Sequence, residues 1–227
     1  MTVLLYGVVE ADAGPVVGMG IDNRPLRAVA DGPLMGIVSD HDDPGPLAAA
    51  DAPDEYERTV QSLMDSRVIL PAQFGRVLVD DDAVRAMLRR RRRDLREKLD
   101  GVRGAVELGL HARWRDGGDG VRDPRSESGT AYLRNRLEMR QSARRLAREL
   151  DPLTALARSI RRALPQRDLP VLDAYLVDRA RVGEFVALVA ELGDLLDGVE
   201  LVCTGPCPPY SFAEAGAQPG GVIRSTA

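Results

Sequence analysis

Alternation between apolar and polar residues is clearest near the middle of the chain. From Ala105 to Trp114 the apolar residues occupy every second position, and residues such as Glu107 and Arg113 lie between them. A period of two is typical of a β-strand that buries one face. Shorter, mostly apolar runs of strand length predict further strands at Val3–Val9, Leu34–Val38, Arg76–Val79, Val171–Val177 and Val199–Thr204.

Helical spacing of apolar residues predicts helices between these strands. One helix begins after Asp54, which is a suitable N-cap residue, and another follows Asp178. A third begins at Asp80–Asp82, because three negative charges favour the N-terminus of a helix. We expect this third helix to run without interruption to Gly101.

The longest predicted helical segment covers residues 128–164. Its apolar residues recur every seven positions in two stripes, the pattern of a coiled-coil seam or a helical hairpin. Pro152 lies inside the segment and predicts a bend or the start of a new helix there. The first stripe holds Tyr132, Met139, Leu146, Leu153 and Ile160, and the second holds Ala143, Leu150, Ala157 and Leu164.

This order of strands and helices predicts an α+β protein of two domains. A chain of 227 residues is long enough for one large or two small domains, each with its own core. We expect an amino-terminal α+β domain over residues 1–103. A carboxyl-terminal α+β domain over residues 104–205 would contain the helical segment, and residues 206–227 would form an arm and tail.

The arm follows the last predicted strand. Pro206, Pro208 and Pro209 each fix φ and lack a backbone donor, so the chain cannot continue as a paired strand. A stiff, extended segment is therefore predicted, and it carries Tyr210 and Phe212 although aromatic residues make up only 4% of the chain. Such a segment is suited to docking, either onto a partner or, as an intramolecular latch, onto the carboxyl-terminal domain.

Composition narrows the possible classes of protein. Apolar residues make up 44% and charged residues 29% of the chain, as in globular proteins. The net charge of −4 argues against general nucleic-acid affinity. The first residues lack the basic and long apolar regions of a signal peptide, and no window is apolar enough to span a membrane. We therefore expect a cytoplasmic protein that binds neither membrane nor nucleic acid.

No residue set predicts catalysis, a cofactor or a metal. Cys203 and Cys207 lack the further Cys or His ligands that zinc needs, so two free thiols are favoured, and a disulfide would have to span Gly205-Pro206. His41 lies among aspartates in what should be a solvated loop, because successive residues cannot all converge on one ion. The Gly-rich segments lack the P-loop pattern. A non-enzymatic protein is expected.

Arginine is concentrated on two predicted helices. The run Arg89–Arg93 has local counter-charges at Asp94 and Glu97, which favours a solvated helix face. The alternative is a regulatory protein that binds an acidic partner or nucleic acid through this run, but no aromatic residue is present for base stacking. The helix from Arg134 to Arg148 is also rich in arginine. Candidate partner-binding residues are Arg89, Arg90, Arg92, Arg93, Arg140, Arg144, Tyr210 and Phe212.

Four segments in this order resemble the gas vesicle protein L/F family. They are Leu4–Glu10, Val68–Gly75, Leu172–Asp178 with Phe185, and Thr204–Phe212, and together they span nearly the whole chain. The last segment, with its T-G-P-x-P-P-Y-S-F pattern, is the most specific. One departure is Cys207, where the family commonly has Trp, so a large docking ring is missing from the arm.

The resemblance implies an accessory or minor structural protein of gas vesicles, which are hollow, gas-filled protein shells. It implies two α+β domains, the amino-terminal one with a ferredoxin-like sheet. It also implies a part in vesicle assembly, through contact with the main shell protein and with other accessory proteins. A shell that keeps water out needs an apolar inner face, so a protein that covers this face on free subunits would suppress their aggregation.

Overall fold

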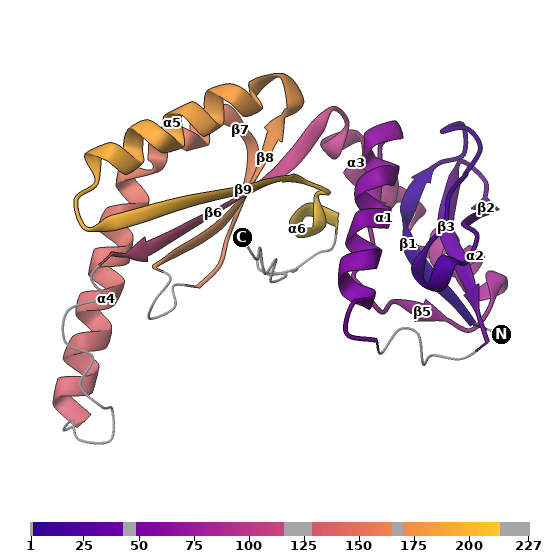
Figure 1. The fold of residues 1–227 in the computed structure, drawn as a ribbon, viewed down its shortest axis with the longest axis horizontal. Helices are drawn as coiled ribbons and strands as arrows, with labels where there is room; N and C mark the ends of the chain where they lie inside the picture. The colour runs from indigo at the N-terminus through magenta and orange to yellow at the C-terminus, as the bar shows by residue number, and fades with distance from the viewer. Residues whose placement is uncertain (1, 43–48, 116–128, 165–169, 214–227) are drawn as a thin grey trace. The chain divides into compact units, whose positions relative to one another are not determined.

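The chain divides into two compact units in a computed structural model, which describes residues 2–42, 49–115, 129–164 and 170–213 (Figure 1). The first unit runs to Gly104 and also includes the segment that begins at Pro208, while the second runs from Ala105 to Cys207. The predicted mixture of helices and sheets is confirmed, with an antiparallel sheet in each unit. The part of the predicted arm that follows Cys207 belongs to the first unit.

The first unit is built on an antiparallel sheet with strand order β2-β3-β1-β4, in which β5 also pairs with β1. The register between β1 and β3 shifts between Leu5 and Gly7. On its other edge, β1 pairs with β5 before this point and with β4 after it. The strands are β1 (Thr2–Glu10), β2 (Arg27–Asp31), β3 (Leu34–His41), β4 (Leu70–Pro71) and β5 (Val77–Leu78), and a short 3-10 turn covers Ile21–Asn23.

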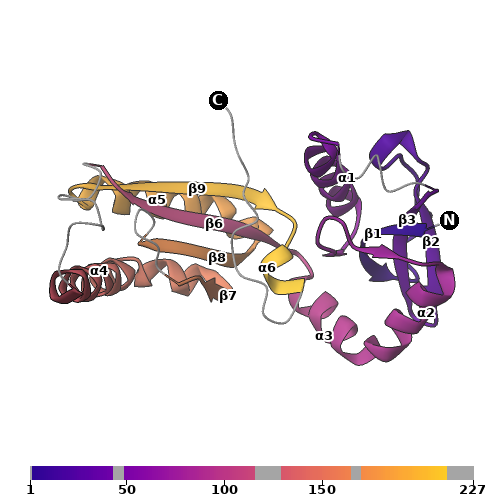
Figure 2. The same cartoon turned by 90° about the horizontal axis from the view of Figure 1, so that it is seen from below.

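Helices cover both faces of this sheet (Figure 2). The ring of Tyr6 stacks on Tyr56 of α1 with centroids 5.0 Å apart. On the other face, Val84 of α2 lies so close to Gly36 that a Cβ atom there would approach it to 2.9 Å, and Leu5 lines the same space. The helices are α1 (Ala52–Ser66), α2 (Asp81–Arg90), α3 (Arg92–Val102) and the short α6 (Tyr210–Ala213).

The single helix predicted from Asp80 to Gly101 is wrong, because the structure has two helices that meet at Arg91. Arg91 has φ −105° and ψ 13°, outside the helical range. After this break α3 packs against β1 and β4, whereas α2 packs against β2 and β3. Two helices with different directions can follow these separate parts of a twisted sheet, which one straight helix cannot do.

His41 is also placed differently from the solvated loop that was predicted. It ends β3, is only 2% exposed, and its Nε2 lies 2.8 Å from Ser39 Oγ. Ser39 Oγ in turn bonds to the Tyr6 hydroxyl at 3.0 Å, which accepts the Ile21 N–H at 2.9 Å. Burial lowers the pKa of His41, so this interior chain of hydrogen bonds is uncharged near neutral pH.

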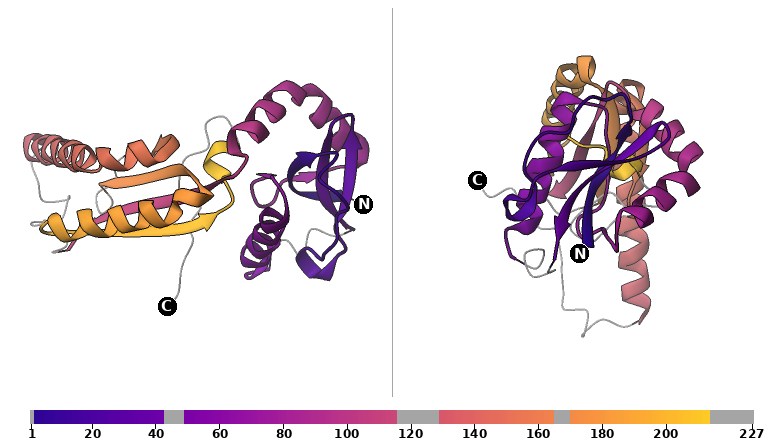
Figure 3. Two further views of the ribbon diagram at one scale, coloured as in Figure 1. Left: turned by 90° about the horizontal axis from the view of Figure 1, so that it is seen from above. Right: turned by 90° about the vertical axis from the view of Figure 1, so that its right-hand side faces the viewer.

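The second unit has a four-stranded antiparallel sheet of order β7-β8-β6-β9, and α5 lies across one face of it (Figure 3). The predicted alternating strand is β6, whose Leu108, Leu110 and Ala112 are fully buried on that face. The elements are β6 (Ala105–Trp114), α4 (Gly129–Glu149), a 3-10 helix (Asp151–Leu156), β7 (Ala157–Arg162), β8 (Val171–Asp178), a 3-10 turn (Arg179–Arg181), α5 (Val182–Leu195) and β9 (Val199–Cys207).

The helical segment predicted over residues 128–164 is correct only in its first part. Helix α4 ends at Glu149, and a 3-10 helix begins at Asp151. Pro152 has no N–H to continue the α-helical hydrogen bonds, which explains the break. Residues from Ala157 onward form β7, where Ile160 pairs with Tyr175. The second half of the heptad pattern is therefore a strand in the sheet. Leu146, Leu150, Leu153 and Leu156 still share one buried core with Phe185 and Val189.

Candidate partner-binding surface

The arginine run at the junction of α2 and α3 is mostly neutralised within the chain. Arg89 and Arg92 both bond to Asp31, at 3.0 and 2.6 Å. Asp31 is only 12% exposed, and the hydrogen bonds from Arg89 and then Arg92 lower the pKa of its carboxyl. This partner could not be predicted from the sequence, because Asp31 lies on β2, far from the run along the chain.

The remaining arginines of the run have local partners or none. Arg91 bonds to Asp94 at 2.9 Å and Arg93 bonds to Glu97 at 2.8 Å, so these two predicted counter-charges are confirmed. Arg90 is exposed and is in no ion pair within the described ranges. The run therefore presents little unpaired charge, which weakens the alternative of nucleic-acid binding through it.

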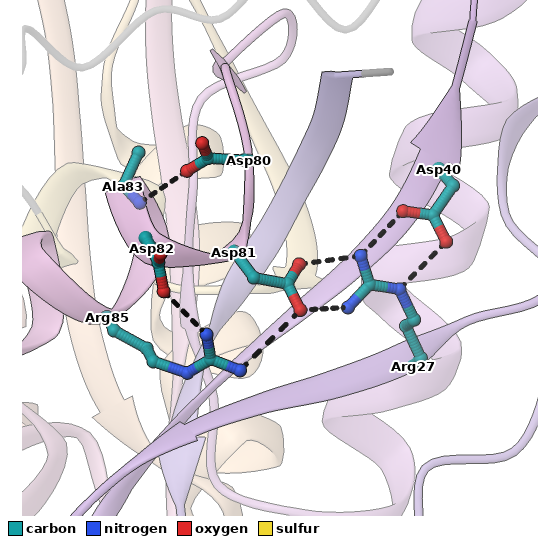
Figure 4. A network of polar contacts seen from close by, with 7 residues as sticks. All are labelled: Arg27, Asp40, Asp80, Asp81, Asp82, Ala83 and Arg85. Atoms are coloured by element: carbon teal, nitrogen blue, oxygen red, sulfur yellow. Dashed lines mark hydrogen bonds and ion pairs between the residues drawn. The ribbon is translucent and has the colours of Figure 1, made fainter.

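Outside the run, Arg27 of β2 links β3 to α2 through an ion-pair network that the sequence did not predict (Figure 4). Its guanidinium makes paired bonds to Asp40 of β3 at 2.6 and 2.8 Å, and to Asp81 of α2 at 2.7 and 3.0 Å. These bonds lower the pKa of Asp40. Beside them, Asp80 Oδ1 accepts the Ala83 N–H at 2.8 Å and caps α2.

Unlike most arginines of the run, the described arginines of α4 are not neutralised by nearby carboxylates. Arg140, Arg144, Arg145 and Arg148 are all exposed, and within residues 129–164 and the other described ranges none of them is in an ion pair. The opposite face of the helix is buried through Ala143, Leu146 and Leu150. The two candidate residues on this helix, Arg140 and Arg144, thus lie together on a basic surface.

The aromatic residues of the arm are not free. Helix α6 packs against α3 and β4 of the first unit, which corrects the expected latch onto the carboxyl-terminal domain. Phe212 is 7% exposed, Tyr210 is half-buried, and Lys98 Nζ donates to the Ala213 carbonyl at 3.1 Å. A partner could contact Phe212 only after the arm leaves this position.

One small cavity is described in the first unit. Under the arm lies a cavity of about 20 Å³, enough for roughly one water molecule. Its lining is mostly apolar and includes Leu70, Met87, Leu95 and Ala213. No group of three or more His, Cys, Asp or Glu side chains suited to a metal ion occurs among the residues described.

Asp173 is one of two buried acids among the described residues of the second unit, the other being Glu107 of β6. Asp173 of β8 is 6% exposed, and its nearest polar partners are Arg162 at 3.6 Å and the Tyr175 hydroxyl at 3.5 Å. Burial raises the pKa of this carboxyl to about 6. A perturbed acid can mark a functional site, but among the described residues Asp173 belongs to no group of three or more His, Cys, Asp or Glu side chains.

In the described part of the chain, every helix is too short or too polar to cross a bilayer.

Comparison with known proteins gives a consistent result. The family model for gas vesicle synthesis protein GvpL/GvpF matches residues 2–214. Gas vesicle protein L of Streptomyces sp. (strain CB03234) is 32% identical over 230 residues, covering 86% of this chain and 85% of that protein. Gas vesicle protein F2 of Halobacterium salinarum is 27% identical over 185 residues, covering 80% and 76%.

Two solved structures share the fold. GvpF from Microcystis aeruginosa has a TM-score of 0.75 at 18% identity, covering 94% of this chain and 99% of that one. GvpF from Anabaena sp. PCC7120 has a TM-score of 0.76 at 19% identity, covering 96% and 98%. At these identities the structures establish the fold alone, while the family model covers nearly the whole sequence. The chain therefore belongs to the gas vesicle protein L/F family.

Proposed function

We propose that this protein takes part in gas vesicle assembly, as an accessory or minor structural component, by binding the main shell subunit. Membership of the family supports a role at gas vesicles. The observation that carries a binding role is the set of exposed arginines on α4, which have no partner within the described residues. Exposed arginines that form no ion pair within the described part of the chain are available to bind carboxylates of another protein.

The physical need follows from the nature of the vesicle. A shell that excludes water must present apolar surface to its interior, and a free subunit would expose that surface to solvent. A protein that holds the subunit until it is incorporated would lower the concentration of aggregation-prone monomer. No bond needs to be made or broken for this role, so we propose that the protein acts in the cytoplasm by association alone.

The residues proposed to bind the subunit belong to both units, and they differ in how accessible they are. Arg140 and Arg144 are available as they stand. In the arginine run, Arg90 and Arg93 are exposed, whereas Arg89 and Arg92 hold Asp31 and would have to exchange partners. Tyr210 and Phe212 would join the surface only if the arm were displaced from α3 and β4.

Co-expression with the shell subunit tests this surface. Recovery of the subunit with tagged wild type is compared with recovery by Arg140→Ser/Arg144→Ser and by Arg90→Ser/Arg93→Ser. A matched control is Arg58→Ser, an exposed arginine on α1. Truncation of the arm is avoided, because it would remove α6 from the first unit.

Reduced recovery with either double variant, and unchanged recovery with the control, is expected. Equal recovery from all four proteins would reject the arginine-rich surface. The role itself is tested separately: cells that lack this chain should form few or no vesicles, and normal vesicle numbers would contradict a part in assembly.

A further inference from the structure

The outer face of α4 carries exposed arginines that form no ion pair among the described residues. Other arginines of this unit do pair with carboxylates: Arg158 pairs with Asp178, and Arg181 bonds to Glu184 at 3.0 Å. Four arginines of α4, namely Arg140, Arg144, Arg145 and Arg148, have no such partner within the described ranges. Like charges one helical turn apart repel each other, so this arrangement does not serve the stability of the helix.

Helical geometry gathers these residues on one side. At about 100° per residue, Leu137, Arg144 and Arg148 fall on a common line, and Arg140 and Arg145 flank it. The buried residues Ala143, Leu146 and Leu150 lie on the opposite side. The line from Leu137 to Arg148 is about 16 Å long at 1.5 Å per residue. We call these five residues, Leu137, Arg140, Arg144, Arg145 and Arg148, the α4 stripe.

We propose that the α4 stripe is a docking surface for an acidic amphipathic helix of another protein. The spacing of Arg140, Arg144 and Arg148 matches carboxylates at every fourth position of a partner helix, and arginine can bond a carboxylate through two N–H groups at once. Leu137 is 58% exposed at one end of the stripe and would meet an apolar residue of the partner.

A helix fits these observations better than nucleic acid does. An exposed leucine in line with the charges offers nothing to a phosphate backbone, whereas amphipathic helices present apolar and charged residues on one face. The chain as a whole carries a net charge of −4, which argues against general affinity for nucleic acid. Of the proposed function, we assume here only that the chain acts by binding another protein.

A synthetic peptide provides the direct test with the full-length protein. The probe is an alanine-based helix of about 18 residues with Glu at every fourth position and one Leu on the same face. Its control is a scrambled peptide of equal composition, in which the Glu residues surround the helix. Fluorescence anisotropy should show tighter binding of the probe than of the control, and weaker binding as salt rises. Equal affinity for both peptides would overturn the proposal.

Matched variants locate the site. Arg140→Gln/Arg144→Gln/Arg148→Gln should weaken probe binding roughly tenfold, since each exposed pair contributes little by itself. Arg24→Gln/Arg58→Gln/Arg96→Gln removes the same charge from exposed positions of the first unit that lie outside the proposed binding residues, and it should leave the affinity unchanged. Equal weakening by the two triple variants would mean that only net charge matters, and it would refute a specific stripe.

Two further comparisons test whether the stripe prefers a helix to other ligands, and whether it is the site that binds the shell subunit. Duplex DNA or phosphatidylserine vesicles that bind the stripe more tightly than the probe would assign it to those classes and overturn the proposal. A triple α4 variant that loses the probe but still recovers the shell subunit would support the stripe and place the subunit elsewhere. A variant that loses the subunit but keeps the probe would refute the stripe.

Discussion

Replacing Tyr6 by Phe tests the buried hydrogen-bond chain of the first unit. The substitution keeps the ring that stacks on Tyr56 and removes only the hydroxyl group. That hydroxyl accepts the Ile21 N–H at 2.9 Å and bonds to Ser39 Oγ at 3.0 Å. Ser39 keeps His41 as a partner, whereas Ile21, which is 1% exposed, loses its acceptor.

The expected cost follows from these two bonds. A buried donor without a partner costs about 1–3 kcal/mol, and the lost bond between Tyr6 and Ser39 contributes about 1 kcal/mol more. We therefore expect the free energy of unfolding of the first unit to fall by about 2–4 kcal/mol. For a unit of this size, such a loss lowers the melting temperature by roughly 8–30 °C.

The assay must distinguish the two units. Trp114 is the chain's single tryptophan and packs against the core of the second unit, so its fluorescence reports that unit. Hydrogen exchange of peptides from β1 and β3 reports the first. Tyr6→Phe should speed exchange in β1 and β3 and leave the Trp114 unfolding transition in place, and Tyr175→Phe is the control with the opposite pattern. A loss below about 0.5 kcal/mol for Tyr6→Phe would refute a stabilising polar chain.

Three other substitutions give separate tests. Burial raises the pKa of Asp173 to about 6, above its unfolded value of about 3.9, so wild-type stability should fall as pH rises from about 4 to about 6. Asp173→Asn should abolish this fall and raise the urea midpoint at pH 7.5, and a persistent fall would contradict the assignment. Arg27 lowers the pKa of Asp40, so its contribution is present at neutral pH and lost as pH falls through the native pKa of that carboxyl. Arg27→Gln should cost about 1–2 kcal/mol at pH 7 and progressively less as pH falls through the native pKa of Asp40; a loss that does not change with pH would count against the network. Phe212→Ala should cost about 2–4 kcal/mol and speed hydrogen exchange in α3 and β4, whereas unchanged exchange would show that the arm does not stabilise the first unit.

The strands were largely predictable because their pattern is local. Strand β6 alternates strictly, and β1, β3 and β8 are apolar runs of strand length. Strand β7 was missed, because Arg158, Ile160 and Arg161 suit a helix as well as a strand. Its pairing with β8 decides the outcome, and no pattern within the segment encodes a partner.

Charge partners show the same limit at the candidate site. The bonds from Arg91 to Asp94 and from Arg93 to Glu97 follow from helical spacing. Asp31 reaches the same arginine run only because α2 packs against β2, which a single sequence does not reveal. The excess of arginine on α4 was visible in the sequence. Whether these arginines have ion-pair partners became clear only from the positions of the surrounding side chains in the structure.

The return of the chain to the first unit has a consequence for biosynthesis. Residues 105–207 form an insertion between two parts of that unit, so α6 is translated after all of them. About a hundred residues separate Gly104 from α6, which corresponds to roughly 5–20 seconds of synthesis at 5–20 residues per second. During this interval α6 is not yet available to pack against α3 and β4. The nascent chain therefore exposes apolar surface that the finished protein buries.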